Sequence, residues 1–161
     1  MATRFKVGAG AGVISTGRYA KDVHVNYYAY FTRALVNEEA KAGIAVKLDP
    51  ENEGYVTACA AGEGDLMYGI LLQNVKEFAD LEREDLYNLD TVRKGQAALL
   101  VYKPAEIETT TYTQDGDFAP GDFVYVGESG YLSATPSGTP IGIALNNCDV
   151  SEGDYLAVKL I

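Results

Sequence analysis

The residue type most often used for acid–base catalysis occurs once in these 161 residues, as His24. Asp22 and Ser15 lie near it, so the ingredients of a catalytic triad are present in composition. No Gly-x-Ser-x-Gly turn presents a serine nucleophile, and no cysteine lies near His24 in the sequence. We therefore interpret His24 as a polar residue of an extended segment, and we expect that the protein is not an enzyme.

Two other stretches resemble cofactor or metal sites. Residues 8–13 read Gly-Ala-Gly-Ala-Gly-Val, but the third glycine of a dinucleotide fingerprint is missing and no βαβ unit surrounds them. Residues 49–54 resemble the opening of a calcium loop, yet Ala60 stands where the closing glutamate would fall. A further acidic turn lies at 115–117, where carboxylates usually serve turn geometry. We expect no cofactor and no metal.

The two cysteines show no pattern of a reactive or ligating pair. Cys59 and Cys148 lack CxxC and metal-ligand spacing, so we expect small buried side chains. Residues 1–30 contain no continuous apolar region of a signal peptide. No apolar run reaches the roughly 18 residues needed to cross a bilayer. The expectation is a soluble protein made in a reducing cytoplasm.

The chain contains an internal repeat. Residues 54–58 (Gly-Tyr-Val-Thr-Ala) recur as 130–134 (Gly-Tyr-Leu-Ser-Ala), and residues 69–74 recur as 142–147. Residues 94–101 resemble 152–159 in the same way. Three matches in the same order indicate two diverged copies of one module.

The spacing between the matches locates an insertion in the first copy. The interval from residue 69 to 95 corresponds to the shorter interval from 142 to 153, so about 15 extra residues lie within 75–92. Phe78, Leu81 and Leu86 fall near helical spacing, with charges between them. The segment is predicted to be a short surface helix or a structured loop.

The repeated segments are typical of β-strands. Residues 123–126 are β-branched and aromatic, and turn residues recur every 8–12 positions, as in small barrels or sandwiches. Gly69 and Gly142 lie inside strand patterns, where glycine marks a bulge, a barrel corner or a close backbone approach. The linking residues 103–112 are also expected to be extended and paired.

The prediction is an all-β fold with minor α content. It consists of two tandem small β-barrel or sandwich-like modules behind an extended N-terminal arm. The predicted divisions are the basic arm at 1–33, β module 1 at 34–110 with its inserted segment at 75–92, and β module 2 at 111–161.

Charge separates the arm from the rest of the chain. Residues 1–33 carry a net charge of +4, whereas the total is −10. A cationic arm on an acidic body indicates docking on an acidic partner, and its sparse basic residues argue against nucleic acid. The tyrosines either join this interface or pack on their own module. The predicted partner contacts are Arg4, Lys6, Arg18, Tyr19, Lys21, Tyr27, Tyr28, Tyr30 and Arg33.

The second copy resembles a known family. Residues 118–126 contain Pro-Gly-Asp, residues 138–145 read Gly-Thr-Pro-Ile-Gly-Ile-Ala-Leu, and Gly-Asp follows at 153–154. This is similar to the capsid decoration (cement) proteins of tailed bacteriophages. The resemblance covers 118–161 well and 43–102 loosely, and it excludes 1–33. The chain departs from the simple pattern by carrying two modules.

The resemblance implies a non-enzymatic structural virion protein built on a small β barrel. Such a protein binds the outer surface of the capsid, bridges capsomers and attaches through its N-terminal arm. The implied partners are the major capsid protein and copies of itself, with a trimer as one arrangement, and neither nucleic acid nor membrane. Two alternatives stay open. One is a tail, neck or head-fibre component, and the other is a β-module protein that binds carbohydrate or peptide.

Overall fold

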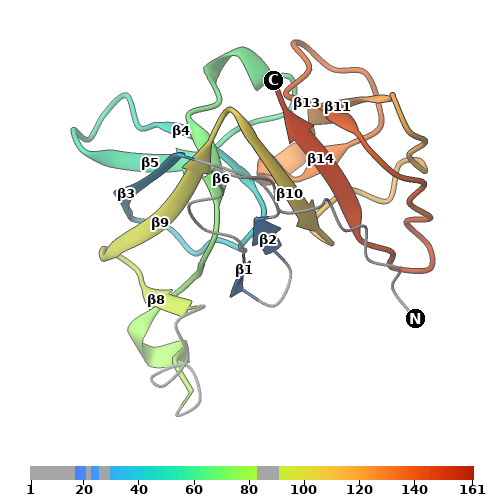
Figure 1. The fold of residues 1–161 in the computed structure, drawn as a ribbon. Helices are drawn as coiled ribbons and strands as arrows, with labels where there is room; N and C mark the ends of the chain where they lie inside the picture. Colours follow the sequence, from blue (N-terminus) through green and yellow to red (C-terminus); the bar gives the residue numbers. More distant parts are fainter. Residues whose placement is uncertain (1–16, 21–22, 26–29, 83–90) are drawn as a thin grey trace.

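Short apolar runs between glycine-containing turns form the strands of this protein (Figure 1). The computed structural model describes residues 17–20, 23–25, 30–82 and 91–161. The strands are β1 (Gly17–Ala20), β2 (Val23–Val25), β3 (Tyr30–Val36), β4 (Ala45–Leu48), β5 (Tyr55–Ala58), β6 (Gly69–Leu71), β7 (Asn74–Lys76), β8 (Thr91–Arg93), β9 (Ala97–Tyr102), β10 (Ala105–Thr109), β11 (Phe123–Val126), β12 (Leu132–Ser133), β13 (Gly142–Ala144) and β14 (Leu156–Leu160). The 3-10 helices are η1 (Gly64–Leu66), η2 (Phe78–Asp80) and η3 (Glu128–Gly130). The predicted all-β fold class is confirmed.

The first module is a closed barrel. Its strands follow the order β3-β5-β4-β6-β9, and β3 returns to pair with β9. The pairing of β3 with β5 is parallel, with Leu35 opposite Tyr55, and the other pairs are antiparallel. Closure leaves this module without a free sheet edge over its paired residues.

The second module repeats this arrangement. Strands β10, β14, β13, β11 and β12 are neighbours in that order, which corresponds to β3, β9, β6, β4 and β5. A parallel bridge between Tyr112 and Leu132 stands where the parallel β3–β5 pair closes the first barrel.

The register of β4, β5, β6 and β9 agrees with that of β11, β12, β13 and β14. Ile70 lies opposite Val101 in the first module, and Ile143 lies opposite Lys159 in the second, as the sequence repeat requires. The amide of Gly43 donates to the carbonyl of Leu71, and the repeat-equivalent amide of Gly121 donates to Ala144. These matches confirm the internal repeat.

The two glycines inside strands mark close backbone approaches. A Cβ added at Gly69 would lie 2.7 Å from the carbonyl oxygen of Val101, and one added at Gly142 would lie 2.8 Å from that of Lys159. Val101 and Lys159 are equivalent in the repeat, so both copies need glycine for the same contact.

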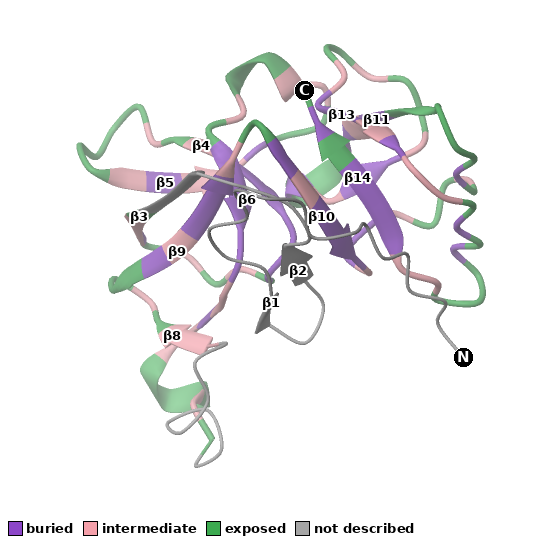
Figure 2. Cartoon of the chain, viewed as in Figure 1, coloured by how far each residue is buried: buried purple, intermediate pink, exposed green. Residues whose placement is uncertain are grey.

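The two modules share one buried core. The largest cluster of buried apolar side chains takes Ala45, Ile70 and Val101 from the first module, and Val126 and Leu132 from the second. A second cluster, which includes Val46, Leu71 and Leu100, lies within the first barrel. Figure 2 shows buried residues on the strands where the two modules meet. The modules therefore pack together as one body.

The N-terminal strands extend the sheet of the second module. Strand β2 pairs with β10, with Val25 opposite Ile107 and His24 opposite Glu108, and β1 pairs with β2. The pairing of β10 with β14 confirms that the 103–112 link contains a paired, extended segment. The boundaries after residues 33 and 110 stay predictions. Strand pairing groups β3 with the first set of strands and β10 with the second.

The inserted segment is partly described. Strands β7 and β8 pair in parallel, and η2 follows β7. Phe78 is exposed, with the Arg93 guanidinium 5.5 Å from its ring centroid, and the chain is extended at Leu81. Residues 83–90 lie outside the described part, so the prediction for Leu86 stays open. Within the described part of the chain, no helix is long and apolar enough to cross a membrane.

Candidate functional site

The predicted contact residues of the arm fall into two groups. Five of them lie outside the described residues: Arg4, Lys6, Lys21, Tyr27 and Tyr28. The other four lie on strands: Arg18 and Tyr19 on β1, and Tyr30 and Arg33 on β3. Arg33 is exposed. The role of these nine residues in partner binding stays a prediction.

An apolar depression lies beside β4 of the first module. It has a volume of about 340 Å³, and its lining residues are Lys47, Leu48, Pro50, Leu66, Met67 and Tyr68. Leu48 is 60% exposed and Leu66 is 52% exposed, although both are large apolar side chains. Exposed apolar residues gathered around one depression are typical of a contact surface.

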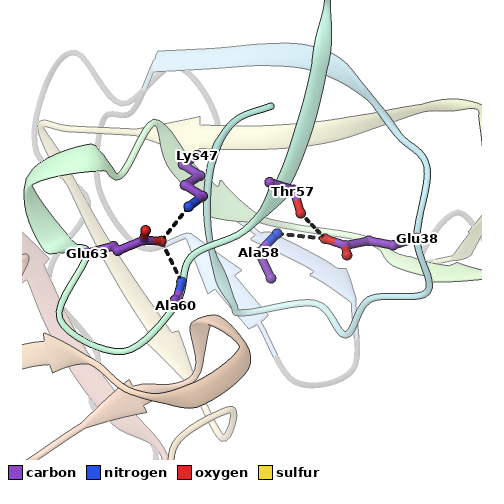
Figure 3. Close-up of polar contacts among 6 residues, drawn as sticks. All are labelled: Glu38, Lys47, Thr57, Ala58, Ala60 and Glu63. Carbon is purple, nitrogen blue, oxygen red and sulfur yellow. Dashed lines mark hydrogen bonds and ion pairs between the residues drawn. The ribbon is translucent and has the colours of Figure 1, made fainter. Parts of the chain in front are cut away.

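An ion pair fixes one wall of this depression. Lys47 Nζ donates to Glu63 Oε2 over 2.6 Å, and the amide of Ala60 donates to the same oxygen over 2.7 Å (Figure 3). These bonds join β4 to the loop that leads into η1. The hydrogen bond from Lys47 lowers the pKa of the Glu63 carboxyl, and the same bond raises the pKa of Lys47. Tyr68, which also lines the depression, stacks on the ring of Tyr102 with the centroids 6.2 Å apart.

A second glutamate fastens the segment after β3 to β5. Glu38 Oε1 accepts hydrogen bonds from the Thr57 hydroxyl and the Ala58 amide, both over 2.7 Å (Figure 3). Tyr131 and Ser129 of the second module line a depression of about 270 Å³ next to it. Because Glu38 accepts these bonds from β5, its position supports a structural role.

Carboxylates of the second module accept hydrogen bonds within turns and between separate loops. Asp117 accepts from the Val150 amide over 3.0 Å, Asp122 from Ala119 over 2.8 Å, and Asp149 from Ser151 over 2.9 Å. Among the described residues, no group of three His, Cys, Asp or Glu side chains could hold a metal ion. The interpretation of the acidic turns as structural elements agrees with these bonds.

Asp49, in the stretch that resembles a calcium loop, also accepts hydrogen bonds within a turn. Its oxygens accept from the Glu51 amide and from the Asn52 side chain, each over 2.9 Å. The Asn52 hydrogen bond lowers the pKa of the Asp49 carboxyl.

Both cysteines are free and buried, which confirms the sequence interpretation. Burial raises the pKa of the Cys59 thiol to about 12 and that of the Cys148 thiol to about 11. A thiol with such a pKa is almost wholly protonated at neutral pH, and the thiol is a poor nucleophile and ligand.

The described residues thus offer contact surfaces and structural carboxylates. Leu48, Leu66 and Tyr68 are not among the contact residues predicted from the sequence. The sequence carries a weak signal for them, since Leu48 ends a strand pattern next to the Asp49-Pro50 turn. Whether such a residue is covered depends on contacts from distant parts of the chain.

No protein-family model matches the chain, and no curated protein matches it. Among solved structures, the fold is similar to that of the head fiber gp8.5 N base of bacteriophage phi29. The match has a TM-score of 0.55 and 14% sequence identity, and it covers 83% of this chain and 94% of that chain. The likeness therefore shows a shared fold over most of both chains.

Proposed function

We propose that the protein is a non-enzymatic structural component of a phage virion. The observation that carries the proposal is the fold shared with the phi29 head fiber base, which extends over both modules. The motifs of residues 118–161 support it independently, because they resemble the decoration proteins of phage capsids. The common element of the two likenesses is a protein attached to the phage head.

Within this class, we propose a position on the outer surface of the capsid, where the chain bridges neighbouring capsomers. The physical basis is a division of charge. The body is acidic, which keeps densely displayed copies soluble and disfavours nucleic acid. The arm sequence is basic and rich in tyrosine, so it suits an acidic face of the major capsid protein.

Cryo-electron microscopy of the virion tests the proposed position. We expect density for the two β modules on the outside of the head. Density in the tail or neck, or no density on the head, would contradict capsid attachment. The arrangement of the density separates two kinds of head protein. A decoration protein covers the shell regularly, whereas a fibre base carries a projecting fibre.

A charge-reversal experiment tests the arm. We expect the double variant Arg4→Glu/Lys6→Glu to co-sediment less with purified capsids than the wild type does. The binding that remains should depend less on salt concentration. The matched control is Lys103→Glu with Lys159→Glu, which makes the same charge change at two exposed positions of the body. Equal loss of binding in both pairs would show that total charge matters and that the arm has no specific role.

A further inference from the structure

The packing of the two modules is head-to-tail, since each contributes a different face. The first module contributes a docking face, defined here as Ala42–Ala45. The second contributes a receiving face, defined here as Thr109, Thr111, Val126 and Gly130. The Thr111 hydroxyl donates to the carbonyl of Ala42 over 2.7 Å, and a Cβ at Gly130 would clash with the carbonyl oxygen of Ala45.

Because the modules are repeats, each face has an equivalent on the other module. The docking face corresponds to residues 120–123 in the second module. Gly43 and Gly121 have φ angles of 98° and 94°, and their amides make the equivalent hydrogen bonds described above. The strand register places Phe123 at the position of Ala45, since they lie opposite Ile143 and Ile70 respectively.

The docking-face equivalent on the second module is open. All four residues from 42 to 45 are buried, whereas all four from 120 to 123 are exposed. Phe123 is 51% exposed, while the equivalent Ala45 is 0% exposed. A Cβ at Gly121 would meet no atom within 4 Å, whereas one at Gly43 would clash with Thr109 and Thr111.

The receiving-face equivalent on the first module is open at the positions that correspond to Val126 and Gly130. The register equates Leu48 with Val126, which lie opposite Val56 and Leu132 respectively. Leu48 is 60% exposed, whereas Val126 is 0% exposed and its carbonyl accepts from the Gly62 amide over 3.0 Å. Gly54, the equivalent of Gly130, has no atom within 4 Å of an added Cβ.

We infer that the open docking face around Phe123 binds the open receiving face around Leu48 on a second copy of this chain. The contact would repeat, between chains, the packing that joins the two modules within a chain. Phe123 is larger than Ala45, and the inferred contact would place its ring against an open surface that includes apolar side chains. Gly54 is open, and the apolar depression lined by Leu48, Leu66 and Tyr68 lies on the same module.

Such a contact is heterologous, so every added copy leaves one docking face and one receiving face open. The assembly either closes into a ring or grows as a filament. This inference rests on strand register and exposure, and it does not depend on the proposed virion function.

A complementation experiment tests the inference with the purified full chain. Phe123→Asp disables the docking face, and Leu48→Asp disables the receiving face. Both side chains are exposed, so we expect each variant to fold, as checked by circular dichroism and thermal melting. The control is Phe78→Asp, because Phe78 is 69% exposed and belongs to neither face.

Sedimentation velocity then measures the state of each sample. We expect wild type and Phe78→Asp to form assemblies and each single-face variant to be monomeric. An equimolar mixture of the two should give a two-chain species, because one intact face of each kind is present. A monomeric wild type, assembly of Phe123→Asp alone or Leu48→Asp alone, or a mixture that stays monomeric would overturn the inference.

Discussion

The equivalent glycines Gly54 and Gly130 allow a matched test of the packing between modules. Their φ angles are 82° and 77°, a region that L-residues rarely adopt. An alanine at either position costs about 1–2 kcal/mol for this backbone conformation alone. The two positions differ in their surroundings. A Cβ at Gly54 meets nothing within 4 Å, whereas one at Gly130 clashes with the Ala45 carbonyl and lies 3.2 Å from Ile44 Cβ.

Gly130→Ala should therefore lower the free energy of unfolding more than Gly54→Ala. The backbone cost cancels in the comparison. What remains is the cost of overpacking at a rigid contact, which is about 1–3 kcal/mol. For a chain of this length, each kcal/mol lowers Tm by about 2–4 °C.

The assay is thermal and urea unfolding of both variants in the Phe123→Asp background, where the proposed contact between chains is disabled. Urea midpoints with unchanged m-values would report stability alone. Equal destabilisation by the two substitutions would refute the reasoning, because it would mean that Ala45 does not lie against Gly130 in solution.

Three further outcomes are expected. In urea denaturation, Ile70→Ala should lower the free energy of unfolding by about 2–5 kcal/mol. The equivalent Ile143→Ala should lower it clearly less, since Ile70 is fully buried and Ile143 is partly exposed. Equal losses would contradict the shared core. Cys59 and Cys148 should resist a thiol reagent at pH 8 in the native protein and react in denaturant, because burial raises both pKa values; rapid native labelling would disprove their burial. The hydrogen bond from Ser151 lowers the pKa of the Asp149 carboxyl below its ordinary 3.8. The stability that the ionised carboxylate contributes is therefore present above that pH and is lost as the pH falls through the lowered pKa. The Tm difference between wild type and Asp149→Ala should shrink on acidification. A difference that stays constant with pH would show that the Asp149 carboxylate does not stabilise the fold.

The repeat could be predicted from sequence because it depends on local chemistry. Gly69 and Gly142 are required by the same backbone approach in each copy, so both copies keep them at matching positions. These landmarks identify the equivalent positions of the two copies, whereas the strand order and the pairing register come from the structure. The inserted segment was harder, since Phe78 and Leu81 have helical spacing but the described part holds only one 3-10 turn and two short strands.

The faces of the modules could not be predicted in the same way. Ala45 and Phe123 occupy equivalent strand positions, as do Leu48 and Val126, and nothing in their local sequence says which is covered. Burial at these positions is decided by the packing of one module on the other. The apolar depression beside Leu48 was missed for this reason.

The pairing of β2 with β10 has a kinetic consequence. The pairs β11–β13 and β13–β14 join neighbouring parts of the chain, whereas β2 meets β10 only after the whole first module has been passed. Closing long loops slows folding because chain entropy is lost before contacts form. During synthesis the first barrel is complete before the second module exists, so its 42–45 face stays uncovered in the nascent chain. The order of synthesis therefore makes the first module the one that is most exposed to mispairing with other copies.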